Sequence, residues 1–564
     1  MKNILFFIKS GLEEISPWQN IKSLNKNIKG DVLAGITVGI IALPLALAFG
    51  EISQLGPIAG IWGAIAGGLI GGLFGGCLVG VSGPTAPKAA QIAVLMSYFV
   101  IGTTNEPDVI AAFSIIFLSG LILIIISILR ISRFIHFTPY PVIAGFMCGI
   151  GAIVIITQIN SFFGLQAEKG IQEVFKNWRF TYENIKIEAL YVSIPSLAIL
   201  FLWNNITERI KYLSNIPAPL ISLLTGTGIA YSMQLNIPYI GDKINVTTND
   251  KLFSIYIPEL SRISEFISPA LALAGLAILD SLLSCKVADN ITGIRHSSDR
   301  ETFGQGMANM AAGLIGGVTT ATATMRTVAN IKFGAKTPLA SIVHGITLLT
   351  IMLGLSGLVS IIPAACLAAI LFKVGIEILD YRIIPVLKKL PINDLMIFSI
   401  VLFFTIYADL MVAISIGIML ACLQSLKELK SIFQLGYKHK STTLLKSGLT
   451  PKNWSENKIN KNSINIFQPE GPLFFGSIES LINSYESITN HNILIVDMSL
   501  VTMIDLTGIY ALEDLVKASK NNNVEVFVSD ACPKIKQKLD DLDFIKHIGK
   551  YHYKDSKKQV LTAI

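Results

Sequence analysis

Long apolar runs dominate the chain up to about residue 427. Asp, Glu, Lys and Arg are absent from 52–87, 110–129, 137–167, 302–325 and 337–372. A membrane-spanning helix needs about 20 mostly apolar residues, so several runs are long enough for two spans each. The pattern predicts a polytopic α-helical membrane protein with about fourteen spans. We place them at 31–50, 57–76, 84–101, 109–130, 139–163, 188–204, 216–234, 267–285, 302–318, 321–332, 338–355, 358–376, 393–409 and 411–427.

The composition supports this class of protein. The 564 residues are 52% hydrophobic and 15% charged, whereas a soluble chain carries about 25% charged residues. The six cysteines are scattered and form no Cys-x-x-Cys pair, so we expect neither a disulfide nor a metal site built on them. The net charge of +7 reflects basic cytoplasmic loops rather than nucleic-acid binding.

The distribution of basic residues predicts the orientation in the membrane. The long outer loops near 165–187 and 235–266 carry mixed or acid-leaning charge. Basic side chains gather on cytoplasmic loops, so both termini are expected in the cytoplasm and the protein in the cell membrane. Residues 1–30 show no signal-peptide pattern and are expected to lie at the inner membrane face. The predicted inner loops hold Arg130, Arg133, Arg209, Lys211, Lys286, Arg295, Arg300, Arg382, Lys388 and Lys389.

The composition changes after the last predicted span. With the transmembrane transport domain at 31–430, residues 431–462 are basic, polar and rich in Asn and Ser, as is typical of a linker. From 463 to 564, short apolar strands such as ILIVDMS and VEVFVSD alternate with segments of helical period such as GIYALEDLVKASKN. This pattern predicts a separate cytoplasmic α/β domain of about 100 residues.

Two predicted spans are short and interrupted. In 84–101, Pro84 and Pro87 bracket Thr85, and 321–332 follows the threonine-rich lead-in GGVTTATATMRT. Broken helices at membrane depth are tolerated where they line an ion site, and their free N–H groups attract anions. Simple kinks are the alternative for either span alone. As third and tenth spans, however, the pair predicts two inverted seven-span halves and a site where the broken helices meet.

One carboxylate stands in an otherwise uncharged span. Asp280 lies in LALAGLAILDSLLSCKVADN, and Ser284 follows one turn later on the same helix face. An intramembrane carboxylate is costly and marks a functional site by default, so we interpret the pair as a Na⁺ or proton site. The alternative is that Asp280 lies nearer the cytoplasmic end and pairs with Lys286 or Arg295.

Two cations near the broken spans allow two interpretations each. Arg326 follows the threonine run, where it could face an anion pathway or cap backbone carbonyls. Lys88 lies one turn into the first broken helix, where a functional role and a snorkelling or structural role are both open.

Three motifs resemble those of the sulfate permease (SulP) family of anion transporters. They are GVSGPTAP at 80–87, TATMRTVANIKFGAKTPLA at 322–340, and ILIVDMSLVTMIDLTGIYALEDL at 493–515 in a segment similar to a STAS domain. The resemblance implies a seven-plus-seven inverted repeat, core and gate bundles that move past each other like an elevator, and a homodimer. Within the family, the chain looks most like the sodium-dependent bicarbonate transporters of cyanobacteria (BicA type).

That resemblance implies specific site residues. Na⁺ would be held by Asp280, Ser284, Thr322, Ala323 and Thr324. The anion would lie between the two broken helices, near Thr85, Ala86, Ala323 and Thr324, with Arg326 supplying positive potential. In the STAS-like domain, Leu506 stands where a phosphorylatable serine is common, so Asp505 and Thr507 are only weak regulatory candidates.

The chain departs from this pattern at three places, and three functions stay open. Ser284 replaces an expected threonine, VTTATAT replaces a lead-in with proline and glycines, and Lys88 is unexpected. The first function is Na⁺-coupled bicarbonate import. The second is transport of sulfate or another oxyanion coupled to H⁺ or Na⁺. The third is an anion channel or sensor regulated through the STAS-like domain. A channel does not need a costly intramembrane carboxylate, so Asp280 argues for coupled transport instead. We expect the protein to be neither an enzyme nor a binder of an organic cofactor. Besides a small inorganic anion, its expected partners are membrane lipids and a regulatory protein that binds the STAS-like domain.

Overall fold

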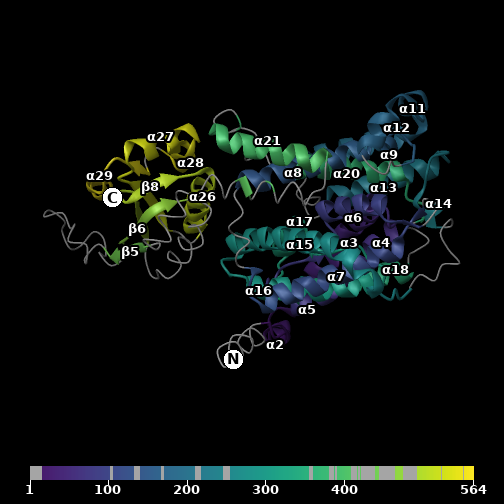
Figure 1. Cartoon of the computed structure of the whole chain (residues 1–564), viewed down its shortest axis with the longest axis horizontal. Coiled ribbons are helices and arrows are strands. Elements are labelled where there is room, and N and C mark those ends of the chain that lie inside the picture. Colours follow the sequence, from purple (N-terminus) through teal and green to yellow (C-terminus); the bar gives the residue numbers. More distant parts are fainter. Residues whose placement is uncertain are drawn as a thin grey trace. The chain divides into compact units, whose positions relative to one another are not determined.

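The computed structural model describes the chain in several stretches. These are residues 15–101, 106–132, 140–166, 171–209, 217–244, 254–354, 360–379, 387, 390–407, 416, 419–420, 438–443, 464–473, 492–521, 524–549 and 552–563. The structure divides into two compact units, one comprising 1–135 with 147–379 and the other 136–146 with 380–564. Figure 1 shows the helical region and the mixed C-terminal domain.

Helices occupy each predicted span from 31–50 through 393–409. The first half contains α3 (Ile28–Ile52), α4 (Pro57–Ala66) continued by the π-helix η2 (Gly67–Gly71) and α5 (Gly72–Phe74), α6 (Ala86–Tyr98), α7 (Val109–Ile128), α8 (Tyr140–Thr157), α9 (Ile159–Phe162), α12 (Ile187–Arg209) and α13 (Ala218–Ser232). The second half contains α15 (Ile263–Thr292), α16 (Ser298–Leu314), α17 (Thr324–Lys332), α18 (Leu339–Gly354), α20 (Ala364–Ile378) and α21 (Ile392–Tyr407). The predicted span 411–427 lies almost wholly outside the described residues.

Shorter elements join these helices. They are α2 (Trp18–Ser23), η1 (Leu24–Lys26), α10 (Ile171–Lys176), α11 (Trp178–Glu183), α14 (Ile240–Ile244) and η5 (Leu260–Arg262). A two-stranded ribbon of β2 (Val100–Ile101) and β3 (Glu106–Pro107) follows α6.

Several helices have the length and apolar character to cross a bilayer. Within the described residues, the five that meet both criteria are Ile28–Ile52, Pro57–Phe74, Val109–Ile128, Tyr140–Thr157 and Ile263–Asp289. Shorter apolar helices cover Ile187–Trp203, Leu339–Gly354 and Ile392–Tyr407. The chain is therefore a helical membrane protein, and the total of about fourteen spans stays a prediction.

Packing within the first unit forms two groups of helices. In the first group, α3, α4, α6, α7 and α15 to α18 pack on one another; in the second, α9, α12, α13 and α20 do so. The first group contains both broken spans, as expected of a core bundle. Its centre is an apolar cluster in which Ile92 of α6, Ile116 of α7 and Leu273 of α15 are fully buried.

Close helix contact in the core depends on small residues. A Cβ atom built on Gly60 of α4 would lie 1.8 Å from the carbonyl oxygen of Ala46 in α3. Only glycine fits there, because any side chain would overlap the neighbouring backbone. The close crossing of α3 and α4 therefore requires glycine at position 60.

The C-terminal domain is an α/β sheet, as predicted. Its sheet has the order β10-β9-β7-β6-β5, with β8 also paired to β6, and only β5 runs antiparallel to its neighbour. The predicted strands at 464–467, 493–499 and 524–530 are confirmed, as is the helix at 508–521. The elements are β5 (Lys438–Thr443), β6 (Ile464–Leu473), β7 (Ile493–Asp497), β8 (Val501–Ile504), α26 (Leu506–Asn521), β9 (Glu525–Ser529), α27 (Pro533–Asp541), α28 (Phe544–Ile548), β10 (Tyr553–Lys554) and α29 (Lys557–Ala563).

One strand of that sheet lies within the predicted linker. Lys438–Thr443 pairs along its whole length with β6, from Lys438 opposite Glu470 to Thr443 opposite Asn465. The central strand β7 is apolar, and Leu494, Ile495 and Val496 are fully buried, as expected of a parallel strand covered on both faces.

Candidate ion-binding site

The two broken helices start from a short antiparallel bridge. Strand β1 (Ser82–Gly83) pairs with β4 (Ala321–Thr322), and the Ala323 N–H extends the pairing by donating to the Val81 carbonyl at 3.0 Å. Helix α6 begins directly after Thr85, and α17 begins directly after Ala323. The bridge therefore joins the N-termini of two half-helices, where unpaired N–H groups favour an anion.

Helix α15 packs against this bridge and presents hydroxyl groups to it. The Thr322 N–H donates to Ser281 Oγ at 3.1 Å. Ser284 Oγ donates to the Asp280 carbonyl at 2.8 Å and lies 2.7 Å from Thr324 Oγ1. The pair predicted from the sequence, Asp280 and Ser284, therefore stands at the start of α17.

Two oxygen atoms at this point are buried and unpaired. Within the described part of the chain, neither Asp280 Oδ2 nor Thr85 Oγ1 has a hydrogen-bond partner. The two side chains are close enough to interact, but they do not reach hydrogen-bond geometry. Because buried unpaired oxygens are unfavourable, the arrangement suits a hard cation that both oxygens could approach.

Two buried cations act on the same carboxylate. Lys88 and Arg326 both interact electrostatically with Asp280, rather than the Lys286 or Arg295 of the alternative interpretation. Arg326 is 1% exposed, and its Nη2 donates to the Pro84 carbonyl at the end of β1. Capping a carbonyl was one of its two predicted roles. Its Nη1 is buried without a partner among the described residues, so one donor is left for an anion.

Glycine allows that arginine to lie against the bridge. A Cβ on Gly83 would stand 2.1 Å from Arg326 Nη1. A side chain at this position would displace the guanidinium from the N-terminus of α6. The motif VSGP at 81–84 thus makes room for the guanidinium just before the start of α6.

The predicted site residues differ in accessibility. Thr85 and Ala86 are 6% and 2% exposed, whereas Ala323 is half-buried and Thr324 is exposed. The site is therefore open on the side of α17. The Thr322 hydroxyl points into a separate polar network, so only the backbone of Thr322 is left to face an ion.

That network centres on Glu301, which the sequence interpretation missed. Glu301 of α16 is 2% exposed. Its Oε2 accepts from the N–H groups of Gly76 and Cys77, both at 2.9 Å. Its Oε1 accepts from the Thr322 hydroxyl and, at 2.9 Å, from Gln305 Nε2. Gln305 also donates to Ser82 at 2.6 Å, so Glu301 connects both strands of the bridge to α16.

The sequence carries only a weak signal for this residue. Glu301 lies in the polar segment DRETF, directly before the predicted span 302–318, and looks like an ordinary first-turn acid. Its partners Gly76 and Cys77 are more than two hundred residues away. Only the fold brings them together.

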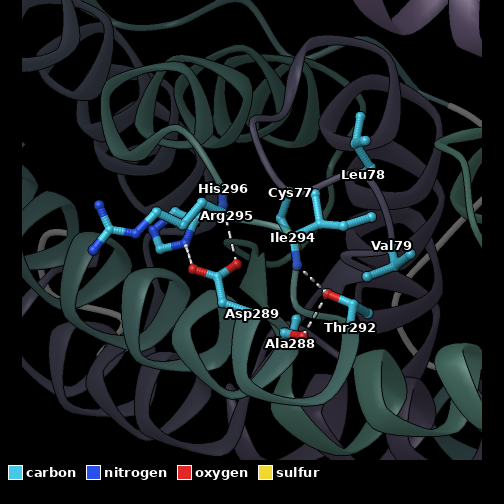
Figure 2. Close-up of a pocket in the computed structure, with 9 residues that line it drawn as sticks. All are labelled: Cys77, Leu78, Val79, Ala288, Asp289, Thr292, Ile294, Arg295 and His296. Carbon is cyan, nitrogen blue, oxygen red and sulfur yellow. Dashed lines mark hydrogen bonds and ion pairs between the residues drawn. The ribbon is translucent and has the colours of Figure 1, made fainter. Parts of the chain in front are cut away.

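A pocket at the C-terminal end of α15 is distinct from this site (Figure 2). There His296 binds Asp289 through Nδ1 at 2.6 Å and through its backbone N–H at 3.0 Å. These bonds fasten the loop between α15 and α16. The pocket is lined by Cys77, Leu78, Val79, Ala288, Asp289, Thr292, Ile294, Arg295 and His296.

The weak regulatory candidates lie at the start of α26. Asp505 Oδ1 accepts from the Gly508 N–H at 2.7 Å, which is a helix-capping bond. Leu506 is 1% exposed, and Thr507 follows it in the first turn of the helix. A regulatory role for Asp505 and Thr507 stays a prediction.

Comparisons with known proteins agree with this architecture. The model of the sulfate permease family matches residues 28–401, and that of the STAS domain matches 457–558. The bicarbonate transporter BicA of Picosynechococcus sp. is 30% identical over 93% of this chain and 92% of its own length. The putative sulfate transporter YvdB of Bacillus subtilis is 28% identical over 94% and 96%.

A solved structure resembles the helical region. The transmembrane domain of a cyanobacterial bicarbonate transporter BicA matches with a TM-score of 0.62 and 31% identity, covering 69% of this chain and 98% of that one. Together with the bridge between two broken helices, these matches identify the class of protein. The chain belongs to the sulfate permease family of anion transporters and carries a C-terminal STAS domain.

Proposed function

We propose that the protein imports bicarbonate coupled to Na⁺. The observation that carries the proposal is the unpaired, buried Asp280 Oδ2 beside the equally unpaired Thr85 hydroxyl, with Ser284 one turn along. Na⁺ approaches Asp280 Oδ2, Ser284 Oγ, Thr324 Oγ1 and the backbone of Thr322 and Ala323. Its charge offsets that of the carboxylate.

The anion then occupies the space at the two helix N-termini. Thr85, Ala86, Ala323 and Thr324 surround it, and Arg326 Nη1 supplies a free donor. The N–H groups at the starts of α6 and α17 add partial positive charge. The names of the relatives support bicarbonate as the substrate.

Transport follows from movement of the core bundle past the gate bundle. Both broken helices and α15 belong to the core, so the bound ions travel with it. We further propose a homodimer in the cell membrane with both termini in the cytoplasm, and a STAS domain that binds a regulatory partner.

Sulfate or another oxyanion is the second candidate substrate. The observation in its favour is the pair of buried cations, Lys88 and Arg326, beside one carboxylate. A site with that surplus of positive charge suits a doubly charged anion. The relatives named as putative sulfate transporters are compatible with it.

Uptake of labelled bicarbonate and labelled sulfate, each with and without Na⁺, tests the proposal. We compare the wild type with Asp280→Asn, and with Glu265→Gln as a control at an exposed position of the same helix. We expect Na⁺-stimulated bicarbonate uptake that falls to background in Asp280→Asn and persists in Glu265→Gln. Sulfate uptake indifferent to Na⁺, with no bicarbonate uptake, would refute it.

A further inference from the structure

Lys88 is anchored across the two halves of the core. It lies in the first turn of α6 and is fully buried. Its Nζ donates to the Thr320 carbonyl and, at 3.4 Å, to Asn309 Oδ1. Thr320 belongs to the lead-in of the second broken helix, so the ammonium group is held at the junction of both.

The groups around Lys88 are held in place to accept hydrogen bonds from its ammonium group. Asn309 is fully buried, and its Nδ2 donates to the same Thr320 carbonyl at 2.9 Å. Asn309 Oδ1 accepts from the Thr319 hydroxyl at 2.6 Å and the Thr320 N–H at 2.8 Å. These bonds fix the position of both Lys88 acceptors. A buried cation in such a frame cannot leave for solvent as a snorkelling lysine does.

Both acceptors of Lys88 are uncharged, and the carboxylate that acts on it is Asp280. Asp280 lies close to Thr85, which Lys88 follows in the first turn of α6, and its carboxylate interacts electrostatically with Lys88 and Arg326. If a carboxylate beside an anion site has no such partner, it repels the anion until Na⁺ binds. Here the protein itself supplies positive charge before any ion arrives.

We propose that Lys88 is a tethered cation that lets the anion site fill without Na⁺, so that Na⁺ strengthens anion binding but is no prerequisite for it. The inference rests on the proposed anion site between α6 and α17. Lys88 acts through the charge balance around Asp280 and needs no contact with the anion, so it is a positioning and specificity residue.

Thermal unfolding of the purified full-length protein tests this inference without relying on transport. Bicarbonate and sulfate are titrated separately in choline gluconate and again in sodium gluconate, because a bound anion raises the unfolding temperature. The variants are Lys88→Met, which keeps length without charge, and Lys88→Arg, which keeps charge. Lys332→Met is the control, since Lys332 is exposed in the last turn of α17.

We expect at least one anion to stabilise the wild type in choline. The apparent affinity of Lys88→Met for that anion in choline is about tenfold lower than that of the wild type, equivalent to about 1.4 kcal/mol. In Na⁺ the affinity of this variant recovers to within about twofold of the wild-type value. Lys88→Arg and Lys332→Met behave as the wild type does.

Three results would overturn the inference. The first is a wild type that no anion stabilises without Na⁺, and the second is an unchanged anion affinity of Lys88→Met in choline. The third is a failure of both variants, in which Lys88→Met does not fold or binds no anion in either salt and Lys88→Arg also binds no anion. If anions bind as expected but labelled bicarbonate is not taken up, only the proposed function fails.

Discussion

Replacing Glu301 by glutamine removes a charge from the connection between α16 and the bridge. The carboxylate accepts four hydrogen bonds, from Gly76, Cys77, Gln305 and Thr322. A glutamine oxygen can still accept from the Gly76 and Cys77 N–H groups. Its amide nitrogen then faces two donors, the Gln305 amide and the Thr322 hydroxyl. The Gln305 bond is lost, and the Thr322 hydroxyl keeps a bond only by turning to accept from the new amide nitrogen.

The magnitude follows from these four bonds. A hydrogen bond to a charged group contributes about 1.5–3 kcal/mol net, against about 1 kcal/mol for a neutral one. At the lower end of these ranges, loss of the Gln305 bond (about 1.5 kcal/mol) and of charge assistance in the other three (about 0.5 kcal/mol each) decreases the free energy of unfolding by about 3 kcal/mol. At about 2 °C per kcal/mol, the unfolding temperature falls by about 6 °C.

The assay is thermal unfolding of the purified full-length protein in one detergent. Glu265→Gln is the matched control, because Glu265 pairs with Arg262 at a site where the side chain is 54% exposed; exposed pairs contribute little. We expect a change below about 1 °C for the control. An unfolding temperature of Glu301→Gln equal to that of the wild type would show that Glu301 is no ionised acceptor and refute the reasoning.

Two further predictions concern packing and ionisation. Gly60→Ala places a methyl group 1.8 Å from the Ala46 carbonyl oxygen, so we expect aggregation on size-exclusion chromatography. Gly228→Ala of α13, whose Cβ meets nothing within 4 Å among the described residues, should elute normally and gain up to about 1 kcal/mol; a monodisperse Gly60→Ala protein would contradict the packing. In the STAS domain, burial and the nearby Asp555, Asp540 and Asp530 raise the pKa of Tyr553 from 10.0 to about 12. Because the folded pKa is the higher one, the contribution to stability is complete below pH 10 and is lost as the pH rises towards 12. Denaturation at increasing pH should show a steeper loss for the wild type than for Tyr553→Phe, and equal slopes would contradict the shift.

The sequence predicts the helices well because their cause is local. Apolar runs of spanning length suffice to place α3, α7 and α15, and two Pro- or Thr-rich interruptions suffice to place the broken helices. The π-helix η2 at Gly67–Gly71 has no such signal, since it lies inside an apolar run that a regular helix would satisfy equally well. Strand β5 was missed because KHKSTT is polar, and its pairing with β6 is decided by the register of the sheet rather than by its own residues.

The candidate site likewise contains residues that the sequence predicts and contacts that it does not. Asp280 and Thr85 could be proposed from the sequence, because a carboxylate and a Pro-flanked threonine are conspicuous in apolar surroundings. The direction of the Thr322 hydroxyl could not, since Glu301, Gln305 and Ser82 determine it from elsewhere in the chain. The same holds for Arg326, whose bond to the Pro84 carbonyl depends on the absence of a side chain at Gly83.

The pairing of β1 with β4 bears on the energetics of a transport cycle. Because backbone hydrogen bonds tie the start of α6 to the start of α17, the two walls of the proposed anion site cannot separate without breaking these bonds. In the transport cycle proposed above, the site would then keep the same two walls whether it opens to the outside or to the cytoplasm, which favours a similar dissociation constant on both faces. Similar affinity on both faces would make the half-saturating anion concentration similar for uptake and for efflux, while the ion gradients and the membrane potential set the direction of net flux.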